Sequence, residues 1–418
     1  MAKWKLQDRI AEIISQPVRI PNASVGKLYE ANLDFEKLGW KDLIFYEFEG
    51  LNDAGLGFDE TTHQIKGTPV VSGDRTLTFK FKLQGQSETD TPHVKDIPLI
   101  INPDPKSLWK NLESSKDDLF YKADEVTKFD RLGDKHILVS SKRGRSHANV
   151  GSFREDDFAY AALYDGWNII AIADGAGSAK MSRKGSDIAC NGILEYFRQE
   201  NIEKNLNHFD DLIASYNDKP SEDAENKLNL FVYENLGNAV LAVHKKLQDF
   251  ASSQNIQLKD LSSTLIFTVF KKYPTGYALL SFGVGDCPMA ILNKELTEVT
   301  LLNWIDVGEF GGGTRFITMP EIFHNEKFST RFGFRQVQDF SYFMLMSDGI
   351  YDPKFVVESK LSEINTWQNF LEDLGGKNDE GLKVELNPLN KNITEEFSRW
   401  MDFWSVGNHD DRTLAIVF

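Results

Sequence analysis

Cysteine is scarce in this chain. Its 418 residues include two cysteines, Cys190 and Cys287, and neither belongs to a Cys-x-x-Cys pair or to a Cys/His cluster. This spacing argues against a disulfide framework and favours a reducing compartment. Positive charge is also in deficit, because 47 Lys and Arg stand against 63 Asp and Glu, a net charge of -16. A phosphate-backbone binder needs a basic surface, so this balance argues against nucleic acid as the main partner.

Long apolar runs are lacking as well. No stretch approaches the roughly 18 uninterrupted apolar residues of a membrane span. Residues 1–17 have the pattern of a short amphipathic helix, without the apolar core and small-residue cleavage site of a signal peptide. We therefore expect a soluble, cytoplasmic protein with no membrane partner. Internal repeats and low-complexity tracts are missing too.

Two regions of different pattern follow the N-terminal helix. Residues 18–105 contain short alternating runs between turn signals, such as Thr76–Leu83, which predict an all-β domain. The prolines at 103 and 105 and the charged sequence that follows, up to about Lys128, predict a linker over residues 106–134, with one short helical piece at 107–112. Residues 135–418 mix apolar strands with helical runs and form the predicted second domain.

Acidic residues stand at the boundaries of five apolar segments in this second domain. Asp174, for example, directly follows the strand-like run Trp167–Ala173. Antiparallel strands bring the end of one beside the start of the next, so such acids can meet at one rim. Clustered carboxylates repel each other, and hard cations such as Mg²⁺ and Mn²⁺ relieve that repulsion. The alternative is that each Asp-Gly pair is a simple turn. The acids in question are Glu155, Asp156, Asp174, Asp286, Asp348 and Asp410.

The ordered set of segments resembles the metal-dependent type 2C (PPM) serine/threonine protein phosphatases. The resemblance covers about residues 135–418. Further segments resemble a bacterial branch of that family. The motifs that carry the family resemblance are Glu155-Asp156, Ala171–Gly177, Ser262–Thr264, Val284–Cys287, Ser347–Gly349 and Asp410–Thr413. The motifs that carry the branch resemblance are Gly144–His147, Gly308–Phe310 and Thr314–Phe316.

The family resemblance implies an α+β fold, a four-layer α-β-β-α sandwich of two antiparallel sheets. It also implies an enzyme that hydrolyses phosphoserine and phosphothreonine in proteins with a metal-activated water at a dinuclear Mg²⁺ or Mn²⁺ site. Asp174 would bridge two ions, with the Gly175 carbonyl on one of them. Asp348 and Asp410 would complete the shell of one ion.

The other ligands follow from the same resemblance. Asp156 and Glu155 would hold the second ion, partly through water, and Asp286 would serve a looser third ion. Asp157 and Asp411 are the register alternatives for Asp156 and Asp410.

The sequence departs from the family pattern where an arginine usually holds substrate phosphate. That position is Gly151 here, and His147, Arg145 or Arg154 could take over the role. His147 could instead donate a proton to the leaving group, or be a structural histidine. Cys287, which replaces a serine of the family, is expected to be buried rather than nucleophilic.

The first domain resembles cadherin-like or immunoglobulin-like (Ig-like) repeats over about residues 20–102. Leu56–Asp59 and Ile65–Pro69 carry this resemblance, which implies a small all-β Ig-like sandwich. Such modules usually bind or position a partner, and the alternative is a passive scaffold. Their usual extracellular setting conflicts with the missing signal peptide, and we favour the cytoplasm.

Two other functions are compatible with the second domain. One is a catalytically inactive phosphatase-like module that binds phosphoproteins or a partner kinase, and the glycine at 151 supports it. The nearly complete acidic set argues against it, because clustered carboxylates are costly. The other is a different metal-assisted hydrolase on the same fold. For the phosphatase, the expected substrate is a phosphoprotein in signalling, and the branch resemblance implies a Ser/Thr kinase and a von Willebrand A-type protein as partners.

Overall fold

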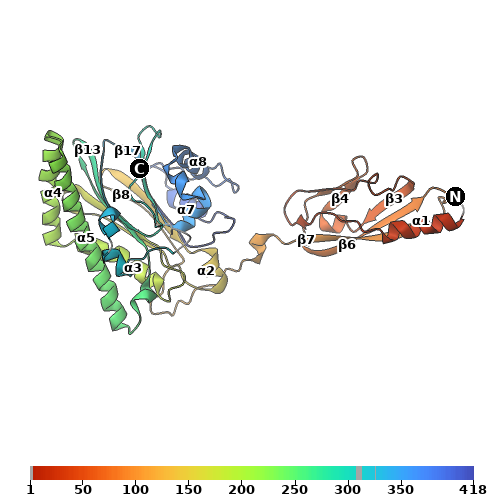
Figure 1. Cartoon of the computed structure of the whole chain (residues 1–418), viewed down its shortest axis with the longest axis horizontal. Coiled ribbons are helices and arrows are strands. Elements are labelled where there is room, and N and C mark those ends of the chain that lie inside the picture. Colours follow the sequence, from red (N-terminus) through yellow and green to blue (C-terminus); the bar gives the residue numbers. More distant parts are fainter. Residues whose placement is uncertain (1–2, 307–312, 325) are drawn as a thin grey trace. The chain divides into compact units, whose positions relative to one another are not determined.

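The computed structural model describes residues 3–306, 313–324 and 326–418. The chain divides into two compact units, Met1–Lys110 and Asn111–Phe418 (Figure 1). Within the described residues, no helix combines the length and the apolar character needed to cross a membrane.

The first unit contains one helix and two small sheets. Its core holds Trp40, Phe79 and Phe81, together with Ile10 and Ile13 of the helix. The sheets have the strand orders β1-β7-β6-β3 and β2-β5-β4. The elements are α1 (Lys3–Ser15), β1 (Ala23–Ser24), β2 (Tyr29–Asn32), β3 (Leu43–Glu49), η1 (Asn52–Ala54), β4 (Leu56–Asp59), β5 (Gln64–Gly67), β6 (Gly73–Leu83), β7 (His93–Asn102) and η2 (Pro105–Leu108).

The alternating run in this unit behaves as the sequence predicts. Thr76–Leu83 lies within β6, where Leu77, Phe79, Phe81 and Leu83 are buried and the residues between them are mostly more exposed. Period-two alternation is what one buried sheet face requires. The Ig-like assignment of the unit stays a prediction.

The second unit holds two antiparallel sheets. One has the order β10-β11-β12-β13-β16 and the other β15-β14-β17-β18-β9-β8. The strands are β8 (Glu125–Leu132), β9 (Lys135–Lys142), β10 (Asp157–Ala162), β11 (Trp167–Ala173), β12 (Leu265–Tyr273), β13 (Gly276–Val284), β14 (Met289–Asn293), β15 (Val299–Leu301), β16 (Phe332–Val337), β17 (Phe340–Met346) and β18 (Arg412–Val417).

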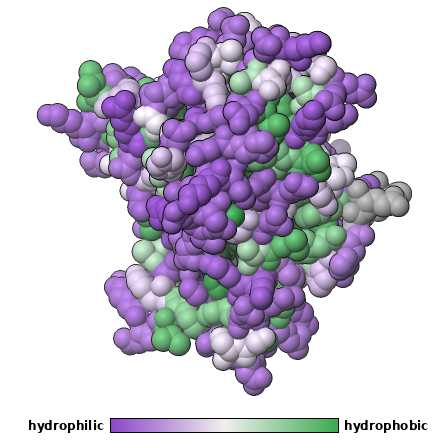
Figure 2. Space-filling model, turned by 90° about the vertical axis from the view of Figure 1, so that its left-hand side faces the viewer, coloured by the Kyte–Doolittle hydropathy of each residue, from purple (hydrophilic) through white to green (hydrophobic). Residues whose placement is uncertain are grey.

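Helices cover the outer face of each sheet. The helices are α2 (Arg145–Val150), η3 (Tyr164–Gly166), α3 (Ser182–Phe197), α4 (Glu200–Asp218), α5 (Glu222–Ser253), η4 (Leu258–Leu261), α6 (Glu321–His324), η5 (Glu326–Arg331), α7 (Asp348–Phe355), η6 (Glu358–Ser362), α8 (Ile364–Leu374) and α9 (Ile393–Trp400). Figure 1 shows α4 and α5 on one side of the sheets, with α7 and α8 on the other. The face on the side of α4 and α5 is mostly hydrophilic, as amphipathic helices require (Figure 2).

Three apolar clusters hold these layers together. The first joins α3, α4 and α5 to the five-stranded sheet, through side chains such as Phe197 and Phe267. The second joins α7, α8 and α9 to the six-stranded sheet and contains Trp367 and Trp400. The third fills the space between the sheets and contains Phe343 and Phe270. The predicted four-layer α-β-β-α sandwich is therefore confirmed.

The stretch expected to be a linker is partly structured. The helical piece predicted at 107–112 is helical only in its first two residues, because the 3-10 turn η2 spans Pro105–Leu108. The Asp104 side chain accepts a hydrogen bond from the Lys106 amide of this turn at 3.0 Å. Residues 125–132 form β8, an edge strand that pairs with β9 and with no other described strand. The charges of β8, which made the stretch resemble a linker, suit an edge strand with a solvated face.

Candidate metal centre and active site

Asp174 lies where β11 ends, next to the start of β12. Its backbone amide donates to Thr264 Oγ1 at 2.8 Å, and its carbonyl accepts from the Thr264 amide at 2.8 Å. Burial raises the pKa of the Asp174 carboxyl well above its ordinary value, and the charges of four other carboxylates add to this effect. Those neighbours are Asp348, Asp156, Asp410 and Asp286. Acidic residues from strand ends that are distant in the sequence therefore lie close enough for their charges to raise the pKa of Asp174.

Asp348 begins α7, directly after β17. Burial raises the pKa of the Asp348 carboxyl well above the ordinary value, and the charge of Asp410 raises it further. A hydrogen bond with the Asp174 side chain acts in the opposite direction and lowers it. Its Oδ1 is buried and has no hydrogen-bond partner. The helix start supplies backbone N–H groups and a favourable dipole for an anionic side chain.

Glu155 and Asp156 precede β10. Burial is the main reason that the pKa of each carboxyl is raised to about 7, and the charge of Asp411 adds to it. Glu155 Oε2 is buried without a hydrogen-bond partner, whereas Asp156 Oδ2 accepts from Thr413 Oγ1 at 2.7 Å. Gly175 packs against Glu155, since a Cβ on Gly175 would lie 2.7 Å from the Glu155 carbonyl oxygen.

Asp411 is 2% exposed, and its carboxylate accepts hydrogen bonds from backbone amides. Its Oδ1 accepts from the Gly144 amide at 2.6 Å, and its Oδ2 accepts from the amides of Glu155 and, at 3.4 Å, Asp156. These bonds leave Asp410 as the freer of the two adjacent acids. The sequence offered Asp411 only as a register alternative, because nothing in a linear pattern shows which amides a carboxylate accepts from.

His147, on α2, faces Asp410. Its Nε2 lies 3.1 Å from Asp410 Oδ1, and its Nδ1 lies 3.1 Å from Ser152 Oγ. Burial alone would lower the pKa of His147, but the hydrogen bond to Asp410 and the nearby carboxylates raise it to about 9. For Asp410, burial is opposed by the bonds from His147 and the Asp411 amide, and the pKa is lowered.

Arg154 is 3% exposed and lies beneath the acids. Its guanidinium donates to the Ala123 carbonyl at 3.0 Å, to Ser141 Oγ at 2.6 Å and to the Asp156 carbonyl at 2.8 Å. These contacts position the backbone of Asp156, and none of them supports a direct contact with substrate phosphate.

Arg145 and Gly151 bound the segment that departs from the family pattern. Arg145 donates to the carbonyls of Asp402 and Phe403. Gly151 ends α2 with a φ of 71°, a left-handed conformation that favours glycine over arginine.

Asp286 follows β13 and accepts from Thr314 Oγ1 at 2.6 Å. Burial raises the pKa of its carboxyl. Gly308–Phe310, the other part of the branch motif, lies outside the described residues. Cys287 is fully buried beside Thr264 Oγ1 at 3.3 Å, and burial raises the pKa of its thiol well above the ordinary value. A thiol in that setting is inert as a nucleophile, as the sequence predicted.

An ion pair that the sequence did not reveal supports the Asp286 turn. Asp306 accepts from both terminal nitrogens of Arg331, at 2.7 and 3.0 Å, and from the Gly285 amide at 2.9 Å. Both side chains are less than 10% exposed. Single charged residues in loops carry no local pattern, so only the fold brings this pair together.

Replacing Arg331 by methionine would leave the Asp306 carboxylate buried without its partner. We expect Arg331→Met to lower the free energy of unfolding by about 3 kcal/mol, as for other broken buried pairs. Urea unfolding followed by circular dichroism measures this. Arg399→Met serves as the control, because Arg399 pairs with Glu395 at the surface, where both side chains are more than 60% exposed. Equal stability of the two variants would show that the Asp306 pair does not support the turn.

The donor set fits hard divalent cations. All of the candidate groups are oxygen donors, two of them hold buried oxygens without a hydrogen bond, and most have raised pKa values because like charges meet in a buried place. Among the described residues, one group of three candidate ligands has all its donor atoms within 4.8 Å, and it comprises His147, Asp410 and Asp411. All three side chains already make hydrogen bonds within the protein.

Comparison with known protein families matches residues 143–387, more than half of the chain, to the family described as protein phosphatase 2C. A search among curated proteins found no match.

Among solved structures, a bacterial serine phosphatase is 13% identical, covering 67% of this chain and 96% of its own, with a TM-score of 0.38. Stp1 from Staphylococcus aureus is 13% identical, covering 73% and 98%, with a TM-score of 0.36. The PstP catalytic domain in complex with two manganese ions is 18% identical, covering 70% and 97%, with a TM-score of 0.38. At these scores none of the three carries an argument about this chain.

The family match confirms the predicted family, enzyme class and metals. Protein phosphatase 2C enzymes act on phosphoproteins and use Mn²⁺ or Mg²⁺. The chain therefore belongs to the protein phosphatase 2C family of metal-dependent serine/threonine phosphatases.

Proposed function

We propose that this chain hydrolyses phosphoserine and phosphothreonine in proteins at a dinuclear Mg²⁺ or Mn²⁺ site. Asp174 would hold both ions and the Gly175 carbonyl one of them, and Asp348 and Asp410 would complete the shell of one ion. Glu155 and Asp156 would hold the second ion, partly through water, and Asp286 would hold a looser third ion. When bound, such ions activate water for attack on phosphorus and neutralise charge on the phosphoryl oxygens.

The protein's own residues would fix this constellation rather than react covalently. Asp411 and Arg154 hold the backbone that presents Glu155 and Asp156. The two ring nitrogens of His147 are hydrogen-bonded, one to Ser152 Oγ and the other to Asp410 Oδ1, and these bonds fix the orientation of the ring. We assign His147 the further role of proton donor to the leaving alkoxide, because a histidine beside the ligands can hold a proton.

The gathering of four other carboxylates around Asp174, whose charges raise the pKa of its buried carboxyl, carries this proposal. Several carboxylates in one buried place are costly unless cations offset the repulsion. A purely structural role for the same residues would leave this repulsion between buried carboxylates without any compensating interaction.

Removal and return of metal test the activity. The full chain, treated with EDTA and dialysed, is expected to lose hydrolysis of a phosphothreonine peptide and to recover it with millimolar Mn²⁺. Released phosphate is measured. Activity that persists in EDTA would contradict the metal-dependent reaction.

The inactive binding module is the second candidate, and the glycine at 151 favours it. The left-handed conformation of Gly151 gives that glycine a structural reason of its own. Binding of the phosphothreonine peptide without phosphate release in Mn²⁺ would favour this candidate.

The partners stay expectations from the resemblance. A Ser/Thr kinase and a von Willebrand A-type protein would be the partners of the branch. The first unit, with its two small sheets, would bind or position one of them. Co-purification of such a partner with the isolated first unit and with the full chain would test that role.

A further inference from the structure

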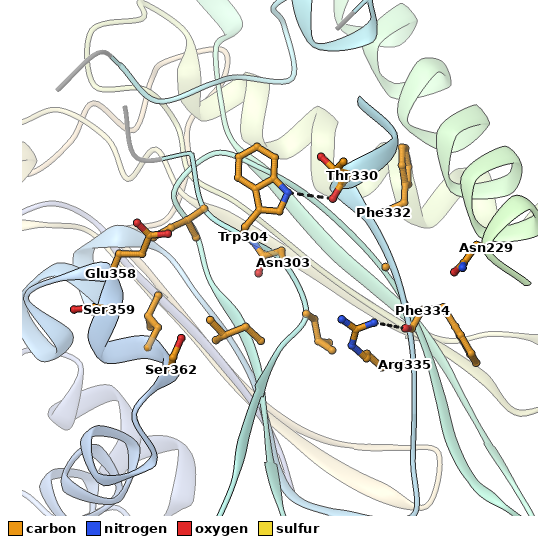
Figure 3. A pocket seen from close by; sticks show the side chains of 15 residues that line it. Asn229, Asn303, Trp304, Thr330, Phe332, Phe334, Arg335, Glu358, Ser359 and Ser362 are labelled. Carbon is orange, nitrogen blue, oxygen red and sulfur yellow. Dashed lines mark hydrogen bonds between the residues drawn. The ribbon is translucent and has the colours of Figure 1, made fainter. Parts of the chain in front are cut away.

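A groove of about 640 Å³ opens between the edges of the two sheets of the second unit. β16, the last strand of the five-stranded sheet, forms one wall, and β15 with η6 forms the other. Figure 3 shows Glu358, Ser359 and Ser362 on one side and Phe334 and Arg335 on the other, with Trp304 above them. We call this space the β16 groove. Its volume is in the range of ligand-binding pockets.

The wall formed by β16 is an open strand edge. β16 pairs with β13 along one side, in the register Ser281↔Gly333 and Leu279↔Arg335, and no other described strand pairs with it. In an antiparallel ladder the backbone groups of every second residue face the partner and the others face away. Arg335 Nη1 donates to the Phe334 carbonyl at 2.8 Å, which places Phe334 in the outward-facing set. Phe332 and Gln336, two residues either side, belong to the same set.

Charge on this edge is positive and available. Arg335 is exposed, and its guanidinium makes no ion pair with a described carboxylate. An incoming strand would take over the Phe334 carbonyl as a hydrogen-bond acceptor, and it would free the guanidinium for an acidic side chain. Apolar side chains such as Leu302 and Ile305 also line the groove. Outward-facing backbone groups, apolar contacts and an arginine without a described ion-pair partner are together what an added acidic strand requires.

The groove begins at the end of the sheet that carries Asp286. Phe332 pairs with Phe282, four residues before Asp286. At roughly 3.3 Å for each extended residue, this corresponds to about 13 Å of chain. A peptide bound along β16 could therefore reach the candidate metal centre with only a few more residues.

We propose that the β16 groove binds an extended, acidic segment of the phosphoprotein substrate as an added strand on β16. This inference rests on the proposed function, since it places the substrate's chain beside the phosphatase centre. The main-chain bonds would give affinity without demanding one sequence, and Arg335 would favour acidic segments.

Kinetics of the full chain in Mn²⁺ test the groove. Arg335→Glu repels an acidic strand, and Gln336→Pro removes an outward N–H at an edge position, where proline is tolerated. Arg131→Glu is the matched control, because Arg131 is an exposed arginine on the edge strand β8 whose guanidinium also bonds a backbone carbonyl. The substrates are phosphorylated casein, an acidic extended protein, and para-nitrophenyl phosphate, which is too small to use the groove.

We expect Arg335→Glu and Gln336→Pro to raise KM for phosphorylated casein about tenfold, with kcat and all para-nitrophenyl phosphate constants unchanged. Arg131→Glu should match the wild type on both substrates. The proposal is overturned if the casein KM of Arg335→Glu equals that of Arg131→Glu. It is also overturned if the wild type hydrolyses para-nitrophenyl phosphate but not casein.

A binding measurement separates this inference from the proposed function. If the wild type hydrolyses neither substrate, the proposed function has failed, and a labelled octapeptide of alternating valine and glutamate still reports on the groove by fluorescence anisotropy. Binding about tenfold weaker to Arg335→Glu than to Arg131→Glu supports the groove. Equal binding to the two variants, or no binding to the wild type, overturns it.

Discussion

Asp174→Asn is expected to lower hydrolysis of para-nitrophenyl phosphate in Mn²⁺ by at least about 10³-fold, which corresponds to about 4 kcal/mol in activation free energy. Asn keeps the shape of the side chain but removes the charge that would hold two ions together. The backbone bonds to Thr264 do not involve the side-chain charge and should persist. Steady-state kinetics at saturating Mn²⁺ measure the effect. Undiminished activity would rule out a bridging role for Asp174.

The same substitution should stabilise the metal-free protein, which separates lost function from lost fold. Burial and neighbouring charges raise the pKa of the Asp174 carboxyl, so the folded state binds its proton more tightly than the unfolded state does. The resulting cost is absent below about pH 4 and grows as the pH rises towards the raised pKa. Thermal unfolding in EDTA at pH 7.5 should give a higher Tm for Asp174→Asn than for the wild type. A lower Tm would mean that the carboxylate supports the metal-free fold.

Gly349→Ala is expected to have the second largest effect. A Cβ at this position would lie 1.9 Å from the Asp411 carbonyl oxygen, so the start of α7 and the start of β18 would have to separate. That movement would displace Asp348 and Asp410 from each other. We expect a loss of activity of about 10²-fold, as for a misplacement of about 1 Å, together with overpacking that costs about 2 kcal/mol. Activity assays and urea unfolding of the same preparation measure both.

Gly177→Ala is the matched control for this glycine. Gly177 lies in the loop that follows Asp174, and a Cβ there would meet no atom within 4 Å. Its activity and stability should stay near those of the wild type. Equal losses in the two variants would show that any alanine near the acids is harmful, and would remove the special role of Gly349.

The strands and their terminal acids were predictable because they are local patterns. The run Trp167–Ala173 is apolar apart from Asn168 and became β11 with the same bounds, since both of its faces are buried between the helices and the second sheet. Asp174 then stands at the strand end by necessity. Apolar residues at helical spacing from Leu228 to Leu247 likewise lie in one helix, α5, where they are buried.

The contacts that support the acids could not be predicted in the same way. Asp411 accepts from amides more than 250 residues away, and Asp306 meets Arg331, which lies 25 positions further along the chain. Such partners depend on how sheets and loops pack, and charged loop residues carry no periodic signal. The burial of Arg154 beneath Asp156 is of the same kind, because a sequence does not show on which side of a backbone a guanidinium lies.

Edge strands were the other weak point of prediction. β8 was expected to be linker because its charges alternate without a strong apolar face. An edge strand needs fewer apolar residues than a central one, since one of its sides meets solvent. The same property, an open edge with mixed polarity, makes β16 a candidate wall for substrate.

The number of divalent ions that the folded protein binds tests the central claim most directly. Equilibrium dialysis of the full chain against Mn²⁺, followed by metal analysis, is expected to give at least two ions for each wild-type molecule and a clear loss in Asp174→Asn. Wild-type protein that binds no Mn²⁺, or an Asp174→Asn variant that binds as many ions as the wild type, would contradict a shared pair of cations held by these carboxylates.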